Sequence, residues 1–491
     1  MSDIDRRALI AGASLIGAMA LARSAKAGQL SPPAGPVGAT GRSLRDVEPR
    51  TPISTLSGSP EAVAVISESG AYVLTGELHV PAGMSGIVVT ASGPVSIDLR
   101  GFAITGSAGS LKGIACVNGQ CSYLEVYDGF IRDCDGDGLD GGPAETLEVD
   151  DVHVSHCGTG IRKALGRMKC TDVTLERAAG HGLVYAPSGA NPGAITALEC
   201  VIDDCEFSEC GGSGVRLEGD YSGIDCSIWV SDCDCHRNGL DGIGGNFGST
   251  PGLNGNDLVT LTIDECNCAG NGRFGIGVQA PISPLGTSVG VLLECSDCTC
   301  ADNASDGLRV QAVRATIQTG DFARNGGDGM NLQDVSGAVE CCLCAHNAAN
   351  GMRCVNVQSA IDEVDCRGNG ADGLFLTNVQ GAIDECECSQ NTLTGIRLSG
   401  GTRGSVCHCA CAENGADGFL IEASCSGLAI TECDARGNAA GFRVDGPNNL
   451  LLWNTASLNV QNFQAGPGTP LVVLSPGDLP ANTNPHANYS L

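Results

Sequence analysis

A six-residue pattern, Asn303-Ala-Ser-Asp-Gly-Leu308, returns 22 residues later as Asn325-Gly-Gly-Asp-Gly-Met330 and again as Asn347-Ala-Ala-Asn-Gly-Met352. Its glycine belongs to a column whose last six intervals are 22 or 23 residues. This period is too short for a propeller blade and carries no helical pattern. We therefore predict one coil of a parallel β-helix per repeat, with about three short strands and coils stacked at roughly 4.8 Å. The glycines are Gly113, Gly138, Gly160, Gly182, Gly214, Gly242, Gly275, Gly307, Gly329, Gly351, Gly373, Gly395, Gly418 and Gly441.

The residues after each glycine indicate which side of the coil they face. After Gly307, Leu308 is predicted to point inward, Arg309 outward and Val310 inward, because side chains alternate along a strand. The turn asparagine recurs in nine coils, and stacked asparagines can hydrogen-bond along the helix axis. We interpret this column as structural. Its members are Asn238, Asn271, Asn303, Asn325, Asn347, Asn369, Asn391, Asn414 and Asn438.

Four segments near the two ends of the chain resemble a known family. They are Glu48-Pro-Arg-Thr-Pro-Ile53, Ser69-Gly-Ala-Tyr-Val-Leu-Thr-Gly76, Val95-Ser-Ile-Asp-Leu-Arg-Gly-Phe102 and Asn484-Pro-His-Ala-Asn-Tyr-Ser-Leu491. They are similar to exported bacterial right-handed parallel β-helix repeat proteins with the pectate-lyase-type fold. Together with the repeat, the resemblance implies an all-β chain forming a single-stranded right-handed parallel β-helix of roughly 16 coils of about 22 residues. It implies little about activity, because this fold hosts lyases, hydrolases, epimerases and non-catalytic binders.

The N-terminus has the features of an export signal. Arg6-Arg7 precede an apolar run from Ala8 to Ala22, and residues 23–27 end in a small-x-small cleavage pattern. The paired arginines resemble a twin-arginine signal, and an ordinary secretory signal is the alternative. We predict a signal peptide at 1–27, a Pro- and Gly-rich linker at 28–60, the β-helix at 61–465 and a C-terminal cap or tail at 466–491. Such a protein is exported, and is periplasmic, at the cell surface or secreted.

The charge of the chain excludes two classes of partner. The formal net charge is −29 at pH 7, and the acidic residues are spread over the whole predicted helix. A body of this charge repels nucleic acid and anionic membrane surfaces. Beyond the N-terminal run, no stretch is long and apolar enough to span a bilayer. We therefore expect no nucleic-acid partner and no membrane insertion.

All 28 cysteines lie between Cys116 and Cys433, and many fall into two columns relative to the turn asparagine. The columns are two residues apart, which places them on one face of a strand. Because Phe322 takes a cysteine position in one column, we predict that both columns hold buried thiols in the core. Disulfides between coils and a thiolate metal site are the alternatives. The columns are Cys235, Cys268, Cys300, Cys344, Cys366, Cys388 and Cys411, and Cys205, Cys233, Cys266, Cys298, Cys342, Cys386, Cys409 and Cys433.

Four consecutive coils are longer than the rest. The insertions lie near 185–197, 218–226, 245–257 and 279–290, at the same position in each coil. Adjacent insertions are expected to form a wall along one side of the helix, and such loops often carry function. Tyr185, Tyr221 and Phe247 lie in or beside them, and aromatic faces suit sugar rings. The alternative is that these insertions are surface loops that bind no ligand.

An outward row of side chains runs beside this wall, two residues after each glycine. Arginine occupies this row at Arg216 and, in alternate coils, at Arg309, Arg353, Arg397 and Arg443. The spacing of about 9.6 Å between alternate coils approximates two sugar units of an extended glycan. Guanidinium groups suit carboxylates or sulfates, so the row suggests a track for an anionic chain. The alternative is that these arginines form a hydrated surface row that binds no ligand. The candidate binding arginines are Arg216, Arg309, Arg353 and Arg397.

The strongest catalytic candidates form one acidic and basic cluster. A lyase on this fold needs a base beside an acidic metal site. Asp140, Arg162 and Lys163 are the candidate catalytic residues, and Asp135 and Asp137 are candidate ligands for Ca²⁺. Because Asp-Gly-Asp-Gly is in phase with the repeat, turn formation explains much of this motif.

The sequence thus predicts a protein that engages an extracellular polysaccharide along its outward strand face. Lyase, hydrolase and epimerase activity are all compatible with the sequence, and enzymatic activity is left open. The rival hypothesis is a structural or adhesive surface repeat protein without catalysis.

Overall fold

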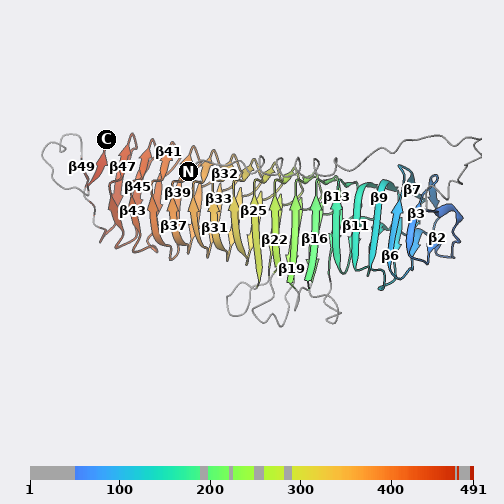
Figure 1. Ribbon diagram of the computed structural model, residues 1–491. Coiled ribbons are helices and arrows are strands. Elements are labelled where there is room, and N and C mark those ends of the chain that lie inside the picture. The colour runs from blue at the N-terminus through green and yellow to red at the C-terminus, as the bar shows by residue number, and fades with distance from the viewer. Residues whose placement is uncertain are drawn as a thin grey trace, which may run out of the picture. The chain divides into compact units, whose positions relative to one another are not determined.

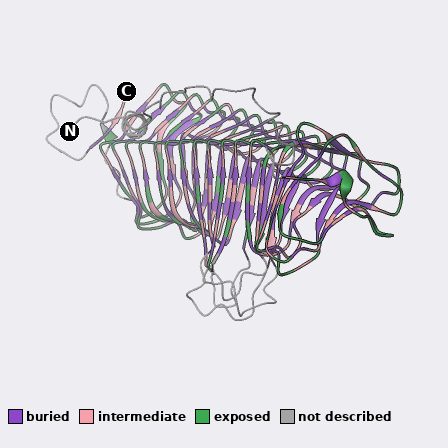
Figure 2. Cartoon of the chain, turned by 45° about the vertical axis from the view of Figure 1, so that its right-hand side comes forward, coloured by how far each residue is buried: buried purple, intermediate pink, exposed green. Residues whose placement is uncertain are grey.

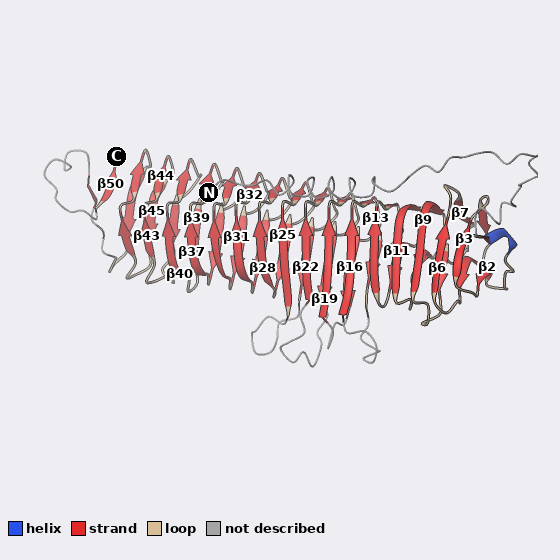
Figure 3. Cartoon of the chain, in the orientation of Figure 1, coloured by secondary structure: helices blue, strands red, loops and turns tan. Residues whose placement is uncertain are grey.

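Nearly all regular structure in the protein consists of short parallel strands (Figures 1 and 3). The computed structural model describes residues 50–187, 197–219, 225–247, 259–280, 290–469, 471, 473–474 and 487–491. These residues belong to one compact unit, Arg50–Leu491. Within them the only helical element is a 3-10 turn, η1 (Ile53–Thr55), and no helix is long and apolar enough to cross a membrane.

Each coil contributes one strand to each of three parallel ladders. In the coil after Gly307 these strands are β27 (Leu308–Gln311), β28 (Arg314–Gln318) and β29 (Asp321–Ala323). Each pairs in register with its counterpart 22 residues on, so that Arg309 lies beside Asn331. We call the three stacks ladder 1, ladder 2 and ladder 3 in this order. The 22-residue repeat therefore corresponds to one coil, as predicted.

Ladder 1 carries the site described below. In the described part of the chain it has 17 strands in sequence order. They are β2 (Ala62–Ile66), β5 (Ser85–Val89), β8 (Ile114–Cys116), β10 (Asp137–Asp140), β12 (Thr159–Lys163), β15 (Leu183–Tyr185), β18 (Val215–Gly219), β21 (Ile243–Phe247), β24 (Ile276–Gln279), β27, β30 (Met330–Gln333), β33 (Met352–Val355), β36 (Leu374–Thr377), β39 (Ile396–Ser399), β42 (Phe419–Ile421), β45 (Ala440–Val444) and β48 (Gln461–Ala465).

Ladders 2 and 3 complete the coil. Ladder 2 runs from β1 (Thr51–Pro52) and β3 (Gly70–Val73) to β46 (Leu450–Leu452). Ladder 3 runs from β4 (Leu78–Val80) to β47 (Thr455–Ser457) and β50 (Asn488–Ser490). Two long strands, β9 (Tyr123–Arg132) and β11 (Thr146–Ser155), belong to both ladders. The four insertions of the sequence fall between ladder 1 and ladder 2, and their central residues lie outside the described part of the chain.

The core fills the inside of the stack. Leu308 and Val310 are fully buried, whereas Arg309 between them is half-buried, which confirms the predicted alternation. The same alternation of buried and more exposed residues recurs along the stack (Figure 2). Phe419 and Phe442 from neighbouring coils stack inside it, with ring centroids 4.6 Å apart.

The predicted asparagine column is a buried hydrogen-bonded ladder at the corner between ladder 3 and ladder 1. The side-chain oxygen of Asn347 accepts from both the backbone N–H (2.9 Å) and the side-chain amide (3.0 Å) of Asn325. Its own amide donates to the backbone oxygen of Phe322, at 2.8 Å, and to Asn369. Each asparagine therefore satisfies backbone groups that the sharp corner would otherwise leave unpaired.

Both cysteine columns lie in the interior, as predicted. All 28 cysteines are free thiols, and they are buried except for the exposed Cys341 and the half-buried Cys407. Burial raises the pKa of Cys226 to about 12, which keeps the thiol protonated and unreactive at neutral pH. Neither the disulfide alternative nor the thiolate metal site is present among the residues that the structure describes.

Strand pairing includes residues close to both ends of the described chain. β1 (Thr51–Pro52) pairs with β3, and Ile53 packs into the core, so strand pairing begins ahead of the predicted start at residue 61. At the other end, β50 (Asn488–Ser490) pairs with β47. Thus the last residues return to ladder 3. The predicted signal peptide at 1–27 and most of the predicted linker lie outside the described residues.

Replacing Asn347 with Ala should destabilise the protein by about 1–3 kcal/mol, because the change leaves the Phe322 oxygen and two donors of Asn325 without a partner. Thermal and urea unfolding followed by circular dichroism would measure the loss. Asn356→Ala is the matched control, because Asn356 is exposed and its hydrogen bonds to Asp334 and Asn378 lie at the surface. Equal stability of the two variants would contradict the structural role of the column.

Titration with a thiol reagent should detect one fast-reacting cysteine, Cys341, in the native protein and all 28 thiols in denaturant without reductant. The fast reaction should accelerate as the pH rises, because the hydrogen bond from Cys341 to Glu363 (2.9 Å) raises the pKa of its thiol. Cys341→Ser should remove the fast phase. Fewer than 28 thiols in denaturant would reveal disulfides.

Candidate functional site

The predicted catalytic cluster is assembled on ladder 1, but its charges are paired. Asp140 on β10 lies beside Arg162 on β12 in the strand register. The Lys112 ammonium contacts both Asp140 and Asp137, and Arg162 Nε lies 3.3 Å from Asp137 Oδ1. The acidic groups therefore already have cationic partners within the protein.

The same pairing argues against the predicted Ca²⁺ site. Lys112 Nζ lies 3.5 Å from Asp137 Oδ2 and takes the place of a bound cation. Asp135 instead accepts a hydrogen bond from the backbone N–H of Gly109, at 2.7 Å. Among the described residues, no three or more His, Cys, Asp or Glu side chains are grouped to hold a metal ion. The structure does not bring Asp135 and Asp137 together as a metal centre.

Lys163, a predicted catalytic residue, has its side chain in the core. It is fully buried, and its ammonium group donates to the backbone oxygens of Gly142 (3.2 Å) and Ala144. Gly141 leaves room for its stem, since a Cβ there would lie 3.0 Å from Lys163 Cδ. Burial lowers the pKa of Lys163 to about 8. Lys163 is thus a core cation without a surface role.

The aromatic residues predicted to bind sugars are not on the surface either. Tyr185 is 0% exposed, and its hydroxyl donates to the Gly166 oxygen at 2.9 Å. Phe247 is 3% exposed. Both occupy inward positions of ladder 1, so neither ring presents a face at the surface. Tyr221 lies outside the described residues.

The outward arginine row exists, but most of its members are paired with carboxylates. Arg309 Nη1 lies 3.7 Å from Asp306, and Arg397 contacts Asp372 (3.6 Å) and Glu422 (2.6 Å). The pairs with Asp306 and Asp372 arise because the residue before the glycine is often Asp and lies beside the arginine of its own or the next coil. Arg216 Nε also donates to a carboxylate, that of Glu218, at 3.0 Å. The Arg353 guanidinium instead lies 6.0 Å from the Phe375 ring centroid.

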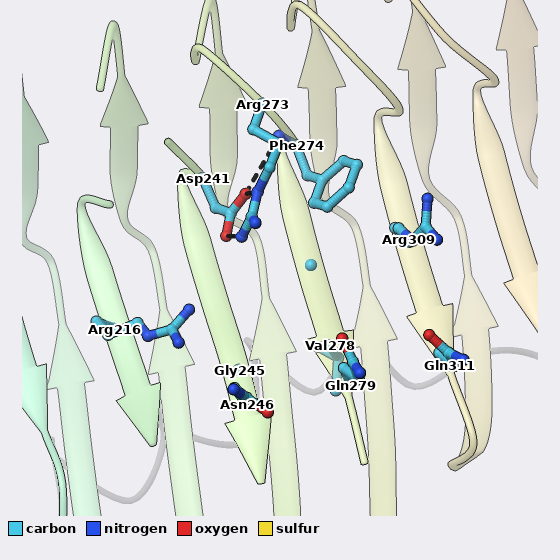
Figure 4. A pocket seen from close by; sticks show the side chains of 11 residues that line it. Arg216, Asp241, Gly245, Asn246, Arg273, Phe274, Val278, Gln279, Arg309 and Gln311 are labelled. Atoms are coloured by element: carbon cyan, nitrogen blue, oxygen red, sulfur yellow. Dashed lines mark hydrogen bonds and ion pairs between the residues drawn. The ribbon is translucent and has the colours of Figure 1, made fainter. Parts of the chain in front are cut away.

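A hollow interrupts this row in the coils that carry the insertions. Arg216, Gly244, Gly277 and Arg309 are neighbours in the register of β18, β21, β24 and β27. Two consecutive glycines leave the surface without side chains between the two arginines, which are about 14 Å apart by the strand spacing. The hollow measures about 120 Å³ and is lined by Arg216, Asp241, Gly245, Asn246, Arg273, Phe274, Gly277, Val278, Gln279, Arg309 and Gln311 (Figure 4).

One end of the hollow is held by an ion pair between a buried carboxylate, Asp241, and a partly exposed guanidinium, Arg273. The Asp241 side chain is 0% exposed and receives two hydrogen bonds from the Arg273 guanidinium, one of them at 2.6 Å. The Phe274 ring lies between two guanidinium groups, whose central carbons are 4.8 Å (Arg273) and 5.4 Å (Arg309) from its centroid. This cation–π packing fixes the directions in which Arg273 and Arg309 present their N–H groups.

The other end of the hollow carries amides. Asn246, Gln279 and Gln311 are neighbours on adjacent strands, and Figure 4 shows them on the side away from Asp241 and Arg273. A side-chain amide both donates and accepts hydrogen bonds. The hollow therefore presents guanidinium donors at one end and mixed donors and acceptors at the other. This set suits a ligand rich in hydroxyl groups with some negative charge.

Sequence reasoning identified the two arginines that flank the hollow and missed most of its interior. The sequence does not single out the other lining residues, because they lie at regular positions of the repeat. These residues are Asp241, Arg273, Phe274 and the amides Asn246, Gln279 and Gln311. One signal was present in the sequence. Gly244 and Gly277 are consecutive glycines in a row otherwise occupied mostly by side chains, and this predicts a depression.

The stacked coils define the protein as a parallel β-helix, and the hollow lies on the outer face of its ladder 1. The sequence model of the family described as right handed beta helix region matches residues 163–321 and 306–464. Together the two matches cover more than half of the chain. The protein therefore belongs to this right-handed β-helix family.

The other comparisons give only distant likenesses. No curated protein matches the sequence. Tailspike protein 3 of bacteriophage CBA120 is 11% identical, with 92% of this chain and 68% of that chain covered and a TM-score of 0.34. The A-module of the Azotobacter vinelandii mannuronan C-5 epimerase AlgE4 is 12% identical, with 86% and 99% covered and a TM-score of 0.27. The periplasmic alginate epimerase AlgG is 10% identical, with 84% and 82% covered and a TM-score of 0.30.

Lys163 should make stability depend on pH in a definite direction. Its folded-state pKa of about 8 lies below the ordinary value of 10.5, so the unfolded chain binds more protons between these values. The native protein should therefore gain about 3 kcal/mol relative to Lys163→Met as the pH rises from 8 to 10.5. Urea unfolding of both proteins across this range would measure the gain. A constant difference would contradict the buried, depressed pKa.

Proposed function

We propose that the hollow on ladder 1 binds a segment of an extracellular polysaccharide. The observation that carries this proposal is the pair of consecutive glycines, Gly244 and Gly277, between Arg216 and Arg309. The glycines open the row over about 14 Å, which approximates three sugar units at the spacing of the strands. The polar groups around the opening come from several coils, as an extended ligand lying across the strands requires.

The size of the hollow favours part of a polymer over a whole small molecule. Its volume of about 120 Å³ is below the roughly 300–1,000 Å³ of pockets that enclose a small ligand. A chain that continues along the outer face of ladder 1 would place only one part of itself in the hollow. The amide row of Asn246, Gln279 and Gln311 extends parallel to the helix axis, along the path of such a chain.

The proposal is binding, and processing of the glycan is not part of it. Asp241 is committed to Arg273, and the predicted catalytic pair Asp140 and Arg162 lies four and three coils from β21 in ladder 1 with its charges paired. The proposal takes the protein to be exported through its N-terminal segment, because an extracellular polymer is the ligand. A structural or adhesive repeat protein is the rival function.

Replacing Arg216 and Arg309 together with Ala should weaken polysaccharide binding at least about tenfold, since charge-assisted hydrogen bonds contribute on the order of 1.5–3 kcal/mol each. Affinity electrophoresis with neutral and acidic polysaccharides, with and without Ca²⁺, would identify the ligand and measure the loss. The matched control is Arg353→Ala with Arg443→Ala, which removes two arginines of the same row outside the hollow.

Chromatography of the same mixtures would follow polymer length. We expect the polymer to elute together with the protein at unchanged length. A shorter polymer would instead reveal a depolymerase activity. Two outcomes would contradict the proposed site: no polymer binds the native protein, or the two double variants bind the polymer with equal affinity. Either outcome would favour the structural or adhesive function.

A further inference from the structure

We infer that the C-terminal end of the β-helix is an interface for a second copy of this chain, so that two molecules associate end to end about a two-fold axis. We call this surface the end face. It consists of β46 in ladder 2, β48 in ladder 1 and the turn 458–460 that leads into β48. The inference does not depend on the proposed polysaccharide site, which lies several coils away on β18 to β27.

β48 is an edge strand, because within the described residues it pairs with β45 on one side only. In the interior coils the N–H group at the first inward position donates to the next coil, as that of Met330 does to the Gly351 oxygen at 3.0 Å. Phe463 takes this position in β48, and no further strand of ladder 1 follows it in the described ranges. Proteins usually protect such an edge with proline or charged side chains, and Gln461–Ala465 contains neither.

The opposite end of ladder 1 is closed. The residues before β2 cross its outer edge, where the Val65 N–H donates to the Ser57 oxygen at 3.1 Å. A Cβ on Gly58 would lie 2.6 Å from the Val63 oxygen, so backbone already fills this edge. Ile53 of η1 packs into the core at the same end. Because one end is closed and the other is open, association joins two equal ends and gives a closed two-fold dimer rather than a filament.

The end face also exposes large apolar side chains. Val460 is 93% exposed and Leu458 is 71% exposed, which are the two highest values for large apolar side chains in the described residues. Leu450 on β46 is exposed as well. The Phe463 ring stacks on Phe442, with centroids 5.1 Å apart, and is only partly buried, so the aromatic column of the core reaches the end face. Covering these side chains would remove apolar surface from water, which drives association.

The distribution of charge favours a second copy as the partner. Residues 446–491 contain one acidic side chain, Asp478, and no Lys or Arg, whereas the whole chain has 56 acidic and 27 basic side chains. Two copies with a net charge of −29 repel each other over most of their surfaces. They meet with least repulsion at the end that lacks charged side chains. A basic partner would instead be drawn to the acidic coils, and an acidic partner finds no cation at this end.

Two-fold symmetry determines how the edges meet. The axis brings identical surfaces together, so β48 would run antiparallel to β48 of the second copy. The contact would cover Leu458, Val460 and the outer side of Phe463 in both copies. It would also close the edge of ladder 1 that the described residues leave open.

Sedimentation equilibrium would test the inference on the chain without residues 1–27, which lie outside the compact unit Arg50–Leu491. We expect a monomer–dimer equilibrium and no larger species. The dimer should become tighter as NaCl rises from about 50 to about 300 mM, because salt screens the repulsion between the acidic coils. Small-angle X-ray scattering should show that the longest dimension grows by about 80 Å, the length of the 17 strands of ladder 1 at their usual spacing.

The decisive variant is Leu458→Asp with Val460→Asp. It places like charges on both sides of the contact in place of apolar side chains, and it should weaken the dimer at least about hundredfold. Both side chains are exposed in the monomer, so thermal unfolding should change little. The matched control is Leu240→Asp with Leu393→Asp, which adds the same charge at exposed leucines (39% and 45%) in interior coils. It should leave the dimer intact.

The other outcomes would overturn the inference. A chain that stays monomeric at every concentration and salt level would show that the end face binds no second copy. A dimer that is equally stable in both double variants, or that has the length of the monomer, would place the interface elsewhere. A series of larger species would indicate head-to-tail association and contradict the two-fold contact.

Discussion

The in-register stacking of coils is the constraint on which the structure depends. Backbone groups of one coil pair with those of the next, so each residue lies about 4.8 Å from its counterpart in the neighbouring coil. Where the same residue recurs in successive coils, its side chain must therefore pack and hydrogen-bond against an identical side chain. Neutral groups that both donate and accept, such as the amide of Asn347, meet this condition, whereas a buried column of like charges does not.

The same constraint explains why so many cysteines occur in the interior. At the corner between ladders 2 and 3, the Cys409 thiol donates to the Cys407 oxygen at 3.1 Å. This column ends at Cys433, where Asn454 takes over and donates to the Ile430 oxygen at 2.8 Å. At the other corner the order is reversed, because Cys210 precedes Asn238 in the column. Thiols and amides thus serve the same corners, and the cysteines are weak donors as well as apolar fillers.

Sequence reasoning succeeded where a property repeats and failed where it depends on neighbouring coils. The period of Gly307 and Leu308 was enough to predict the coil, the inward and outward positions and the asparagine column. The pairing of Arg397 with Asp372 and Glu422 could not be seen, because these residues meet only once the register is known. Tyr185 lies beside an insertion in the sequence, but it is the third residue after Gly182 and therefore points inward.

A binding site on a solenoid must break the repeat that builds it. A regular row offers every coil the same surface, so no position along it is distinguished from the next. On ladder 1 the regular alternation of large outward side chains stops at Gly244 and Gly277. The backbone ladder is unaffected, because glycine pairs in register as any other residue does. The fold therefore keeps its stability in the repeated positions, and the few irregular positions are available for recognition.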